Sequence, residues 1–176
     1  KTFAETGQIS YGNNERPIEG ATDFLWMICL SFFSYFGIEE NITSLVFSSI
    51  AIFYILKQIY NKSLSILIGL FAVILTPYMW SAAQGFSTLV FSAIYVFCIL
   101  ALQKKDDEKM YLGILLLCLV RPDGVAWGAP LVLLNLINDR IDFQKIKKVF
   151  FILIIPGLTY FFLRFIYFDE FLPLPF

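Results

Sequence analysis

Histidine is absent from this chain of 176 residues, and charged residues make up only 15% of it. Without histidine, a histidine base, a histidine nucleophile relay and histidine ligation of a metal are all excluded. Because 59% of the residues are hydrophobic, these charges are too few to cover the surface of a soluble globule of this size. The composition therefore predicts a membrane protein, and a net charge of −1 gives no reason to expect nucleic acid as a partner.

Cysteine is scarce as well. Three cysteines stand singly inside apolar runs, where we expect them to act as small hydrophobic residues: Cys29, Cys98 and Cys118. The chain begins at Lys1 without a methionine or a signal-peptide pattern, and it ends within the run "FLPLPF". We therefore expect it to be an internal fragment of a longer protein.

Apolar segments separated by short charged connections make up most of the chain. A helix of about 20 residues crosses the hydrocarbon core of a membrane, and lipid offers no hydrogen-bond partners to open strands. The predicted fold is therefore an all-α, polytopic transmembrane helical bundle. The segments expected to be helical are Phe24 to Phe36, Thr43 to Leu56, Leu64 to Trp80, Phe86 to Leu102, Met110 to Val120, Val125 to Ile137 and Val149 to Phe168.

Lysine and arginine in short connections mark the cytoplasmic side of a membrane. Here they fall mainly in alternate connections, at residues 57–62, 104–109 and 140–148. Glu39 and Glu40, the loop "WSAAQG" and the terminal "FDEFLPLPF" contain neither residue and are predicted to face outside. The chain is therefore predicted to be a multi-pass protein of the cytoplasmic (inner) membrane.

The first apolar segment is short. Phe24 to Phe36 would form a helix of only about 20 Å, which Thr22 or Asp23 can cap and Gly37 can end. Such a helix either lies on the outer surface or dips partway into the membrane.

The segment Met110 to Ile137 is also unusual, because "RPDG" at residues 121–124 breaks it into two arms that are too short to cross a membrane. It is predicted to enter and leave on the cytoplasmic side, with the break below the outer surface. Non-helical backbone at that depth is tolerated only inside protein or beside a watery cavity. Charged residues in the break are therefore candidates for function.

Two interpretations of the break remain open, and they are compatible. Arg121 and Asp123 neutralise each other and cap the two arms, or Arg121 binds an anionic head group, since guanidinium suits phosphate. Arg164, near the outer end of the last segment, either extends to the interface or joins Arg121 in binding a lipid phosphate.

A cluster of charges precedes the first apolar segment: Glu15, Arg16, Glu19 and Asp23. Their spacing allows either a solvated loop with internal ion pairs or a role in sugar binding or acid–base catalysis, for which carboxylates are the most plausible bases without histidine. These carboxylates could also coordinate a divalent cation, although no ligand spacing indicates one and no cofactor is evident. Three tryptophans are expected to anchor the interface, with stacking on sugar rings as the alternative: Trp26, Trp80 and Trp127.

Four motifs, in order along nearly the whole chain, resemble those of one family. "NNERPIEGATDFLW" resembles E-R-x-x-E-G-x-T-x-x-L-W, and "WSAAQGFSTLVF" resembles W-x-x-x-x-G-M-E-T-x-x-F. "LVRPDG" resembles L-x-R-P-D/E-G, and "RFIYFDEFLPLPF" resembles R-x-x-Y-Y/F-G-x-x-L-P-N-x-F. The chain thus resembles a GT-C-type integral-membrane glycosyltransferase, in the branch of arabinofuranosyltransferase-like enzymes that use polyprenyl-phosphate sugars.

The resemblance implies a GT-C-type bundle with its active site outside. Residues 1–41 would form an extracytoplasmic loop with an outer-surface juxtamembrane helix, residues 42–168 the transmembrane helical region and residues 169–176 the start of a following extracytoplasmic segment. Matching positions imply that Glu19 positions the sugar or the loop, that Arg121 and Arg164 bind lipid phosphate, and that Asp123 shapes the cavity. The catalytic base is expected upstream of Lys1, with Glu19 as the alternative.

Three positions depart from the family pattern. Ser87 stands in place of a glutamate, Asp169 in place of a glycine and Leu174 in place of an asparagine. Roles that the family assigns to these positions are therefore not carried over.

These observations lead to the hypothesis of a membrane hexosyl- or pentosyltransferase that moves a sugar from a polyprenyl-phosphate donor to an extracytoplasmic acceptor, a cell-envelope glycan, lipid or protein. A carboxylate base would deprotonate the acceptor hydroxyl while cations stabilise the departing phosphate. One alternative is a transporter or flippase of lipid-linked glycans, although transporters often carry paired broken helices and this chain has one broken hairpin. The other is a catalytically inactive relative that binds glycan.

Overall fold

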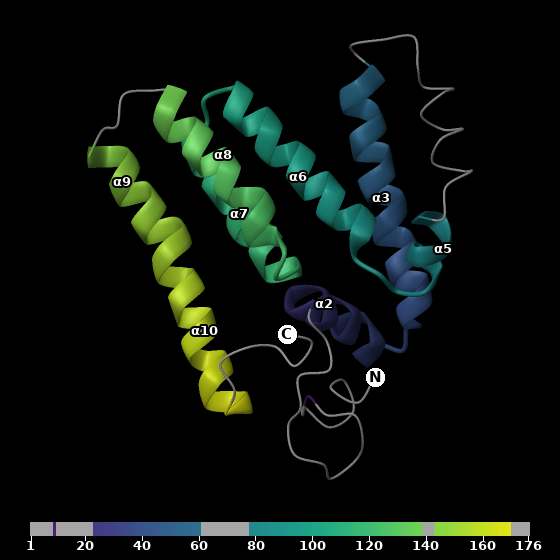
Figure 1. The fold of residues 1–176 in the computed structure, drawn as a ribbon. Helices are drawn as coiled ribbons and strands as arrows, with labels where there is room; N and C mark the ends of the chain where they lie inside the picture. Colours follow the sequence, from purple (N-terminus) through teal and green to yellow (C-terminus); the bar gives the residue numbers. More distant parts are fainter. Residues whose placement is uncertain (1–8, 10–22, 61–77, 139–142, 170–176) are drawn as a thin grey trace.

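The chain folds into helices, most of which run side by side, as seen in a computed structural model (Figure 1). The structure describes residue 9 and residues 23–60, 78–138 and 143–169, and within these ranges every regular element is helical. The prediction of an all-α fold is therefore confirmed. In chain order the elements are α2 (Phe24–Tyr35), α3 (Glu40–Tyr60), α5 (Tyr78–Ala83), α6 (Thr88–Gln103), α7 (Asp107–Val120), α8 (Gly124–Asn138), α9 (Phe143–Val149), the π-helical turn η1 (Phe150–Ile154) and α10 (Ile155–Phe168).

Most of the predicted apolar segments lie largely within these helices. The segment Thr43 to Leu56 is longer in the structure, because α3 begins at Glu40 and continues past Lys57. An acidic residue in the first turn and a basic residue in the last turn both stabilise a helix. The predicted segment Leu64 to Trp80 lies outside the described residues up to position 77.

The loop "WSAAQG" begins as a helix, which corrects its prediction as a plain connection. α5 continues to Ala83, because no residue before Gly85 in this stretch disfavours a helix. Gly85 has a φ of 89°, a left-handed conformation that glycine adopts readily. The N–H of Phe86 then donates to the carbonyl oxygen of Ser81 at 3.1 Å, which closes the end of the helix.

The largest core cluster lies between α6, α7 and α8. Its buried side chains are Cys98, Ala101, Met110, Tyr111, Ile114, Leu117 and Leu131. Helices α6 and α7 approach each other closely at Gly113, where a Cβ atom would lie 2.6 Å from the Sγ atom of Cys98. Cys98 is therefore a packing residue, as predicted, and all three cysteines are free thiols.

Helices α7 and α8 form an antiparallel hairpin, which confirms the predicted break (Figure 1). α7 ends because Arg121 takes an extended backbone conformation, which a following proline favours. α8 begins at Gly124, where a Cβ atom would lie only 2.4 Å from the carbonyl oxygen of Leu117. The turn lies short of the ends of α3 and α10, with α2 beyond it (Figure 1).

Helices α9, η1 and α10 are continuous from Phe143 to Phe168, a length of 26 residues. The π-helical turn precedes Pro156, which has no N–H to donate within the helix. This long helix and the segment Glu40–Gln58 of α3 are long and apolar enough to cross a membrane. The side chains of α10 are largely exposed, and Leu158 and Phe162 are each 64% exposed. An exposed apolar surface of this extent fits contact with lipid or another apolar partner.

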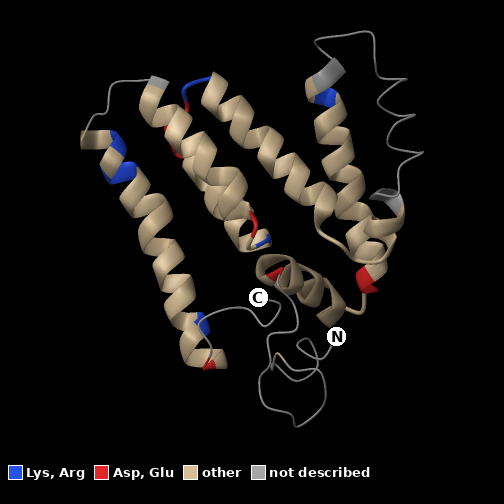
Figure 2. Ribbon diagram, in the orientation of Figure 1, with Lys and Arg blue, Asp and Glu red and all other residues tan. Residues whose placement is uncertain are grey.

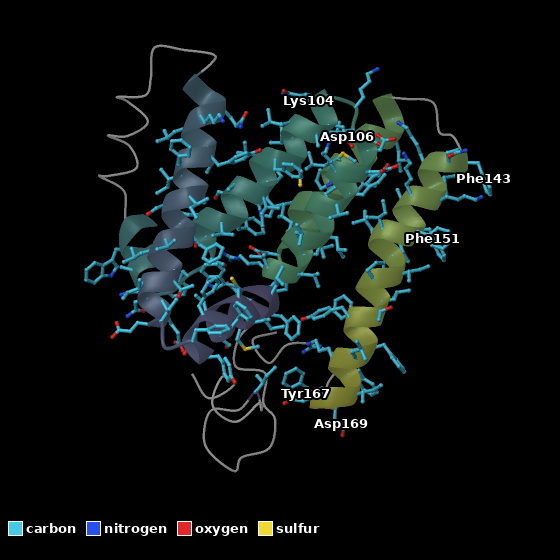
Figure 3. The ribbon with its side chains drawn as sticks, turned by 180° about the vertical axis from the view of Figure 1, so that it is seen from behind. Lys104, Asp106, Phe143, Phe151, Tyr167 and Asp169 are labelled. Atoms are coloured by element: carbon cyan, nitrogen blue, oxygen red, sulfur yellow. The ribbon has the colours of Figure 1, made fainter. Side chains whose placement is uncertain are left out.

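The two ends of the helices carry different cations (Figure 2). Lysine occurs at the end of α3, between α6 and α7 and at the start of α9, which lie at one end, here called the lysine end. The described arginines, Arg121 and Arg164, belong to the α7–α8 turn and the last part of α10, at the opposite end, here called the arginine end. Seen from behind, Asp106 marks the lysine end and Asp169 the arginine end (Figure 3). The predicted alternation of connections is thus present in space, while the cytoplasmic location of the lysine end stays a prediction.

Helix α2 lies across the arginine end and not along the other helices (Figure 1). Its 12 residues give a length of about 18 Å, and it packs against α3 and α7. The structure thus shows a short helix that crosses the end of the others, while its location on the outer surface of a membrane stays a prediction.

Candidate functional site

The four motif segments all lie at the arginine end (Figure 1). The first motif includes the start of α2, the second the connection between α5 and α6, the third the α7–α8 turn and the fourth the last turn of α10. Contacts between their side chains and backbones join the first to the second and the second to the third. The candidate site is built from these contacts.

Two hydrogen bonds attach α2 to the connection between α5 and α6. The indole Nε1 of Trp26 donates to the carbonyl oxygen of Gly85 at 2.6 Å, and the hydroxyl of Ser87 donates to Oδ2 of Asp23. Trp26 is 5% exposed and Ser87 is fully buried. The prediction that Trp26 anchors the interface is therefore wrong, because its ring packs inside the protein, edge-on to Phe47.

Asp23 is the N-cap residue of α2 by position, but its carboxylate makes no capping bond to that helix. It accepts the hydroxyl proton of Ser87 instead, and hydrogen bonds to a charged acceptor are stronger than those between neutral groups. Of the two predicted caps, Asp23 therefore takes the N-cap position without a side-chain bond to α2, and Thr22 lies outside the described residues. Asp23 links α2 to the start of α6.

Arg121 forms an ion pair with Asp123 inside the α7–α8 turn. The Arg121 Nε lies 3.0 Å from the Oδ1 of Asp123, and these side chains are 33% and 45% exposed. The guanidinium also lies over the ring of Phe91, 5.5 Å from its centroid. Within the described ranges, Asp123 is the one hydrogen-bond acceptor of this guanidinium, which has five N–H donors. Mutual neutralisation is therefore confirmed, and the geometry leaves donors for a second anion.

Arg164 is 5% exposed, and its guanidinium lies 6.0 Å from the centroid of the Phe168 ring. A side chain that extended into the interface would be exposed, so the snorkelling interpretation is wrong for Arg164. One turn earlier, the ring of Tyr160 lies 5.0 Å from that of Phe24 in α2. The backbone N–H of Ile9 donates to the hydroxyl of Tyr167 at 3.1 Å, so α10 contacts both α2 and the polar lead.

Three predicted site residues lie outside the described residues: Glu15, Arg16 and Glu19. Their roles in sugar binding, and Glu19 as an alternative base, stay predictions. In the part of the chain that the structure describes, no group of three or more histidine, cysteine, aspartate or glutamate residues could hold a metal ion.

Two further residues of this site were not predicted as contacts. Ser87 and Phe91 are four residues apart at the start of α6, a spacing that places both on one face of the helix. Ser87 contacts Asp23 and Phe91 contacts Arg121. The i, i+4 spacing was visible in the sequence, but nothing in it named the partners.

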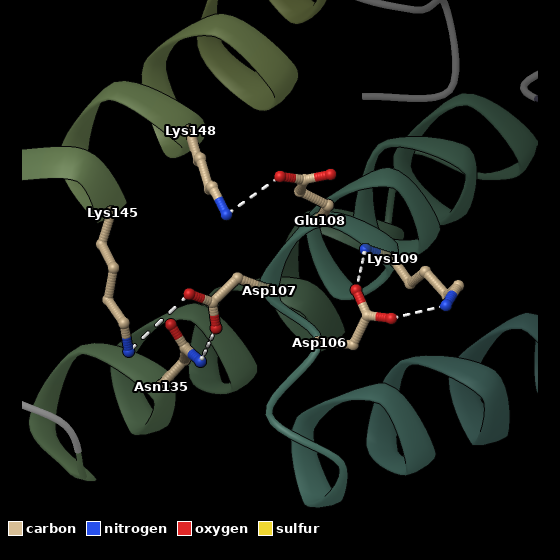
Figure 4. Close-up of polar contacts among 7 residues, drawn as sticks. All are labelled: Asp106, Asp107, Glu108, Lys109, Asn135, Lys145 and Lys148. Atoms are coloured by element: carbon tan, nitrogen blue, oxygen red, sulfur yellow. Dashed lines mark hydrogen bonds and ion pairs between the residues drawn. The ribbon is translucent and has the colours of Figure 1, made fainter.

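The lysine end holds a polar network that was not predicted either (Figure 4). The hydroxyl of Tyr111 donates to Oδ1 of Asn135 at 2.7 Å, and Nδ2 of Asn135 donates to Oδ1 of Asp107 at 2.9 Å. The other oxygen of Asp107 lies 3.9 Å from Nζ of Lys145. Tyr111 and Asn135 are buried. The network therefore ties α8 and α9 to the first turns of α7.

Asp106 caps the start of α7 beside this network (Figure 4). Its carboxylate accepts hydrogen bonds from the side chain of Lys109 at 2.6 Å and from its backbone N–H at 3.2 Å. These bonds, the side-chain bond foremost, lower the pKa of Asp106 from its ordinary value. Nearby, Lys148 pairs with Glu108 at 3.0 Å. Asp107 and Glu108 thus join α7 to α9, whereas Asp106 stabilises the start of α7 itself.

The arginine end has the groups that bind an anion next to hydroxyls. A partly exposed guanidinium suits a phosphate, and a carboxylate accepts hydrogen bonds from hydroxyl groups. Proton transfer in this chain would rely on carboxylates, because histidine is absent. Comparison of the chain with protein-family models, with curated proteins and with solved structures finds no match in any of the three.

Proposed function

We propose that this chain belongs to an integral-membrane glycosyltransferase of GT-C type that transfers a sugar from a polyprenyl-phosphate donor to a cell-envelope acceptor outside the cytoplasmic membrane. The observation that carries the proposal is that four separate motif segments lie at the arginine end, opposite the lysines. Contacts between Trp26 and Gly85 and between Phe91 and Arg121 join three of these segments.

Two further features support the proposal. The long helix from Phe143 to Phe168 exposes an apolar surface that suits lipid. Asp169 stands where the resembled family has glycine, and its φ of 56° is in the left-handed region that glycine favours. The backbone here therefore keeps the conformation that a glycine would serve, even though the residue differs.

Arg121 is assigned to the phosphate of the donor. When the bond between sugar and phosphate breaks, negative charge develops on the leaving phosphate, and a fixed guanidinium stabilises it. Asp123 holds Nε of Arg121 at 3.0 Å, so the guanidinium is oriented before the donor binds. A carboxylate outside the described residues would take the proton of the acceptor hydroxyl.

The test is a transfer assay on the full-length protein in membranes, with radiolabelled polyprenyl-phosphate pentose and polyprenyl-phosphate hexose as donors. Arg121→Ala is expected to lower transfer by roughly 10²- to 10³-fold, the usual effect of removing a preorganised donor to a developing charge. Lys147→Ala, which removes an exposed cation at the lysine end, serves as the matched control and should transfer normally.

Asp123→Asn separates the two roles of Arg121, because it weakens the ion pair and leaves the guanidinium in place. It is expected to lower transfer less than Arg121→Ala does. Equal losses in both variants would mean that Arg121 acts only through its partner, and full activity of Arg121→Ala would remove the phosphate assignment. Glu19→Gln tests the polar lead in the same assay, where normal transfer would return Glu19 to a solvated loop.

A further inference from the structure

Asp23 and Ser87 stand at the starts of two different helices, α2 and α6, and neither side chain caps its own helix. They bond to each other instead, the Ser87 hydroxyl donating to the Asp23 carboxylate. Because Ser87 is fully buried, its hydroxyl is shielded from water. The bond therefore fixes one oxygen of Asp23 against the start of α6.

A second bond keeps this geometry from shifting. Trp26, three residues after Asp23 in α2, donates to the carbonyl oxygen of Gly85 at 2.6 Å. The first turn of α2 is thus held at two points to the same connection. An oxygen fixed in this way can accept a ligand hydrogen bond without losing much conformational freedom.

Ser87 and Phe91 also connect Asp23 and Arg121 to the same part of α6. They are one turn apart on α6, which is a rise of about 5.4 Å, and they contact Asp23 and Arg121 respectively. A carboxylate and a guanidinium thus flank the first turn of one helix. A ligand that contacts both groups would have an anionic group for the guanidinium and a hydroxyl group for the carboxylate, as a sugar phosphate does.

We propose that Ser87 is a positioning residue for Asp23, and that the Asp23 carboxylate accepts a hydrogen bond from a hydroxyl of the sugar whose phosphate contacts Arg121. The inference rests on the proposed function and adds to it the residue pair that recognises the sugar. Ser87 does not touch the ligand and acts through Asp23.

The test is a double-mutant cycle in the transfer assay on the full-length protein, with Asp23→Ala, Ser87→Ala and the double variant. Ser87→Ala is expected to lower kcat/KM about tenfold, the scale of one charge-assisted hydrogen bond. Asp23→Ala should lower it further, and the double variant should equal Asp23→Ala, because Ser87 has nothing to orient without the carboxylate. Ser92→Ala is the matched control, since this α6 hydroxyl donates only to the carbonyl oxygen of Thr88 in its own helix, at 2.9 Å.

A donor series distinguishes positioning from simple support of the fold. The donors in this series are polyprenyl-phosphate sugars that each lack one ring hydroxyl. For the wild type, removal of the hydroxyl that Asp23 accepts should lower kcat/KM more than removal of any other. In Asp23→Ala and Ser87→Ala, this difference between donors should disappear. Two results would overturn this inference while leaving the proposed function in place. One is the same difference between donors in wild type and variants; the other is a tenfold effect of Ser87→Ala that persists in the Asp23→Ala background. Absence of transfer by the wild type overturns the proposed function itself.

Discussion

The buried network at the lysine end yields a quantitative prediction about stability. Asn135 accepts from the Tyr111 hydroxyl at 2.7 Å and donates to Asp107 at 2.9 Å, and it is 2% exposed. Asn135→Leu keeps the approximate size of the side chain and removes both bonds. The hydroxyl of Tyr111, which is fully buried, then has no acceptor.

The expected loss is the sum of two effects. A buried hydroxyl without a partner costs about 1–3 kcal/mol, and a hydrogen bond to a charged group contributes about 1.5–3 kcal/mol. Without Asn135, the carboxylate of Asp107 still contacts water, because it is 14% exposed, and it still lies 3.9 Å from Nζ of Lys145. The expected total is therefore near the lower end of the sum, about 3 kcal/mol. For a chain of this size, that lowers the melting temperature by roughly 6–12 °C.

Tyr111→Phe is compared with Asn135→Leu. It removes the hydroxyl that donates to Oδ1 of Asn135, so this amide oxygen loses its donor from Tyr111. The expected loss is about 1 kcal/mol. In the double variant Tyr111→Phe/Asn135→Leu, two facing apolar groups replace the polar pair and no hydroxyl is left unsatisfied. The double variant should therefore be more stable than Asn135→Leu alone.

The assay is unfolding of the protein in detergent micelles, by heating or by titration with sodium dodecyl sulfate, followed by far-ultraviolet circular dichroism. The coupling between the two positions is obtained from the four proteins of the cycle. Losses that simply add, so that the double variant is the least stable of the four, would contradict the contribution assigned to the buried hydroxyl.

Three further predictions concern single positions. Gly124→Ala places a Cβ atom 2.4 Å from the carbonyl oxygen of Leu117 and should destabilise the hairpin by about 1–3 kcal/mol. Gly157→Ala, with open space around it, should instead stabilise its helix by about 0.5–1 kcal/mol. Equal melting temperatures of the two variants would contradict the close approach at Gly124. The lowered pKa of Asp106 contributes stability above its ordinary value of 3.8 that is lost as the pH falls through the lower folded value. Melting curves of wild type and Asp106→Asn should therefore differ at neutral pH and converge in strong acid. Asp169→Gly should raise the melting temperature slightly, by relief of about 0.5–1 kcal/mol at a left-handed position, and a lower value would mean that the aspartate side chain stabilises this turn.

The helices could largely be predicted from the sequence, because apolar runs and the residues that end them are local signals. The break at residues 121–124 is an example: the extended Arg121 before a proline and the tight approach of Gly124 are both properties of the local sequence. The shortness of the first segment indicated that it was no ordinary span, but its length left two placements open. The end of α5 was misplaced, because the predicted connection began before the glycine that stops the helix.

The contacts of the candidate site could not be predicted in the same way. Asp23 and Ser87 are 64 positions apart, and Trp26 and Gly85 are 59 apart, so these pairs depend on how α2 crosses the other helices. The local sequence predicted Trp26 as an interface anchor, because it gave no sign that the distant carbonyl oxygen of Gly85 would accept the indole N–H. The pair Tyr111 and Asn135 is different: the two residues lie at equal sequence distances on either side of Asp123, so the hairpin itself implies that they face each other.

The π-helical turn η1 decides which residue of α10 faces α2 and the polar lead. A π-helical turn corresponds to one residue inserted into a helix, and one residue of an α-helix corresponds to a rotation of about 100°. Every side chain after Ile154 is therefore turned by that angle relative to an uninterrupted helix that starts at Phe143. The buried face of α10 contains Arg164 because of this rotation, since without it one of the apolar neighbours Leu163 and Phe165 would point in that direction. A single extra residue, about three turns before the arginine, thus determines whether α10 buries a cation at this end of the molecule.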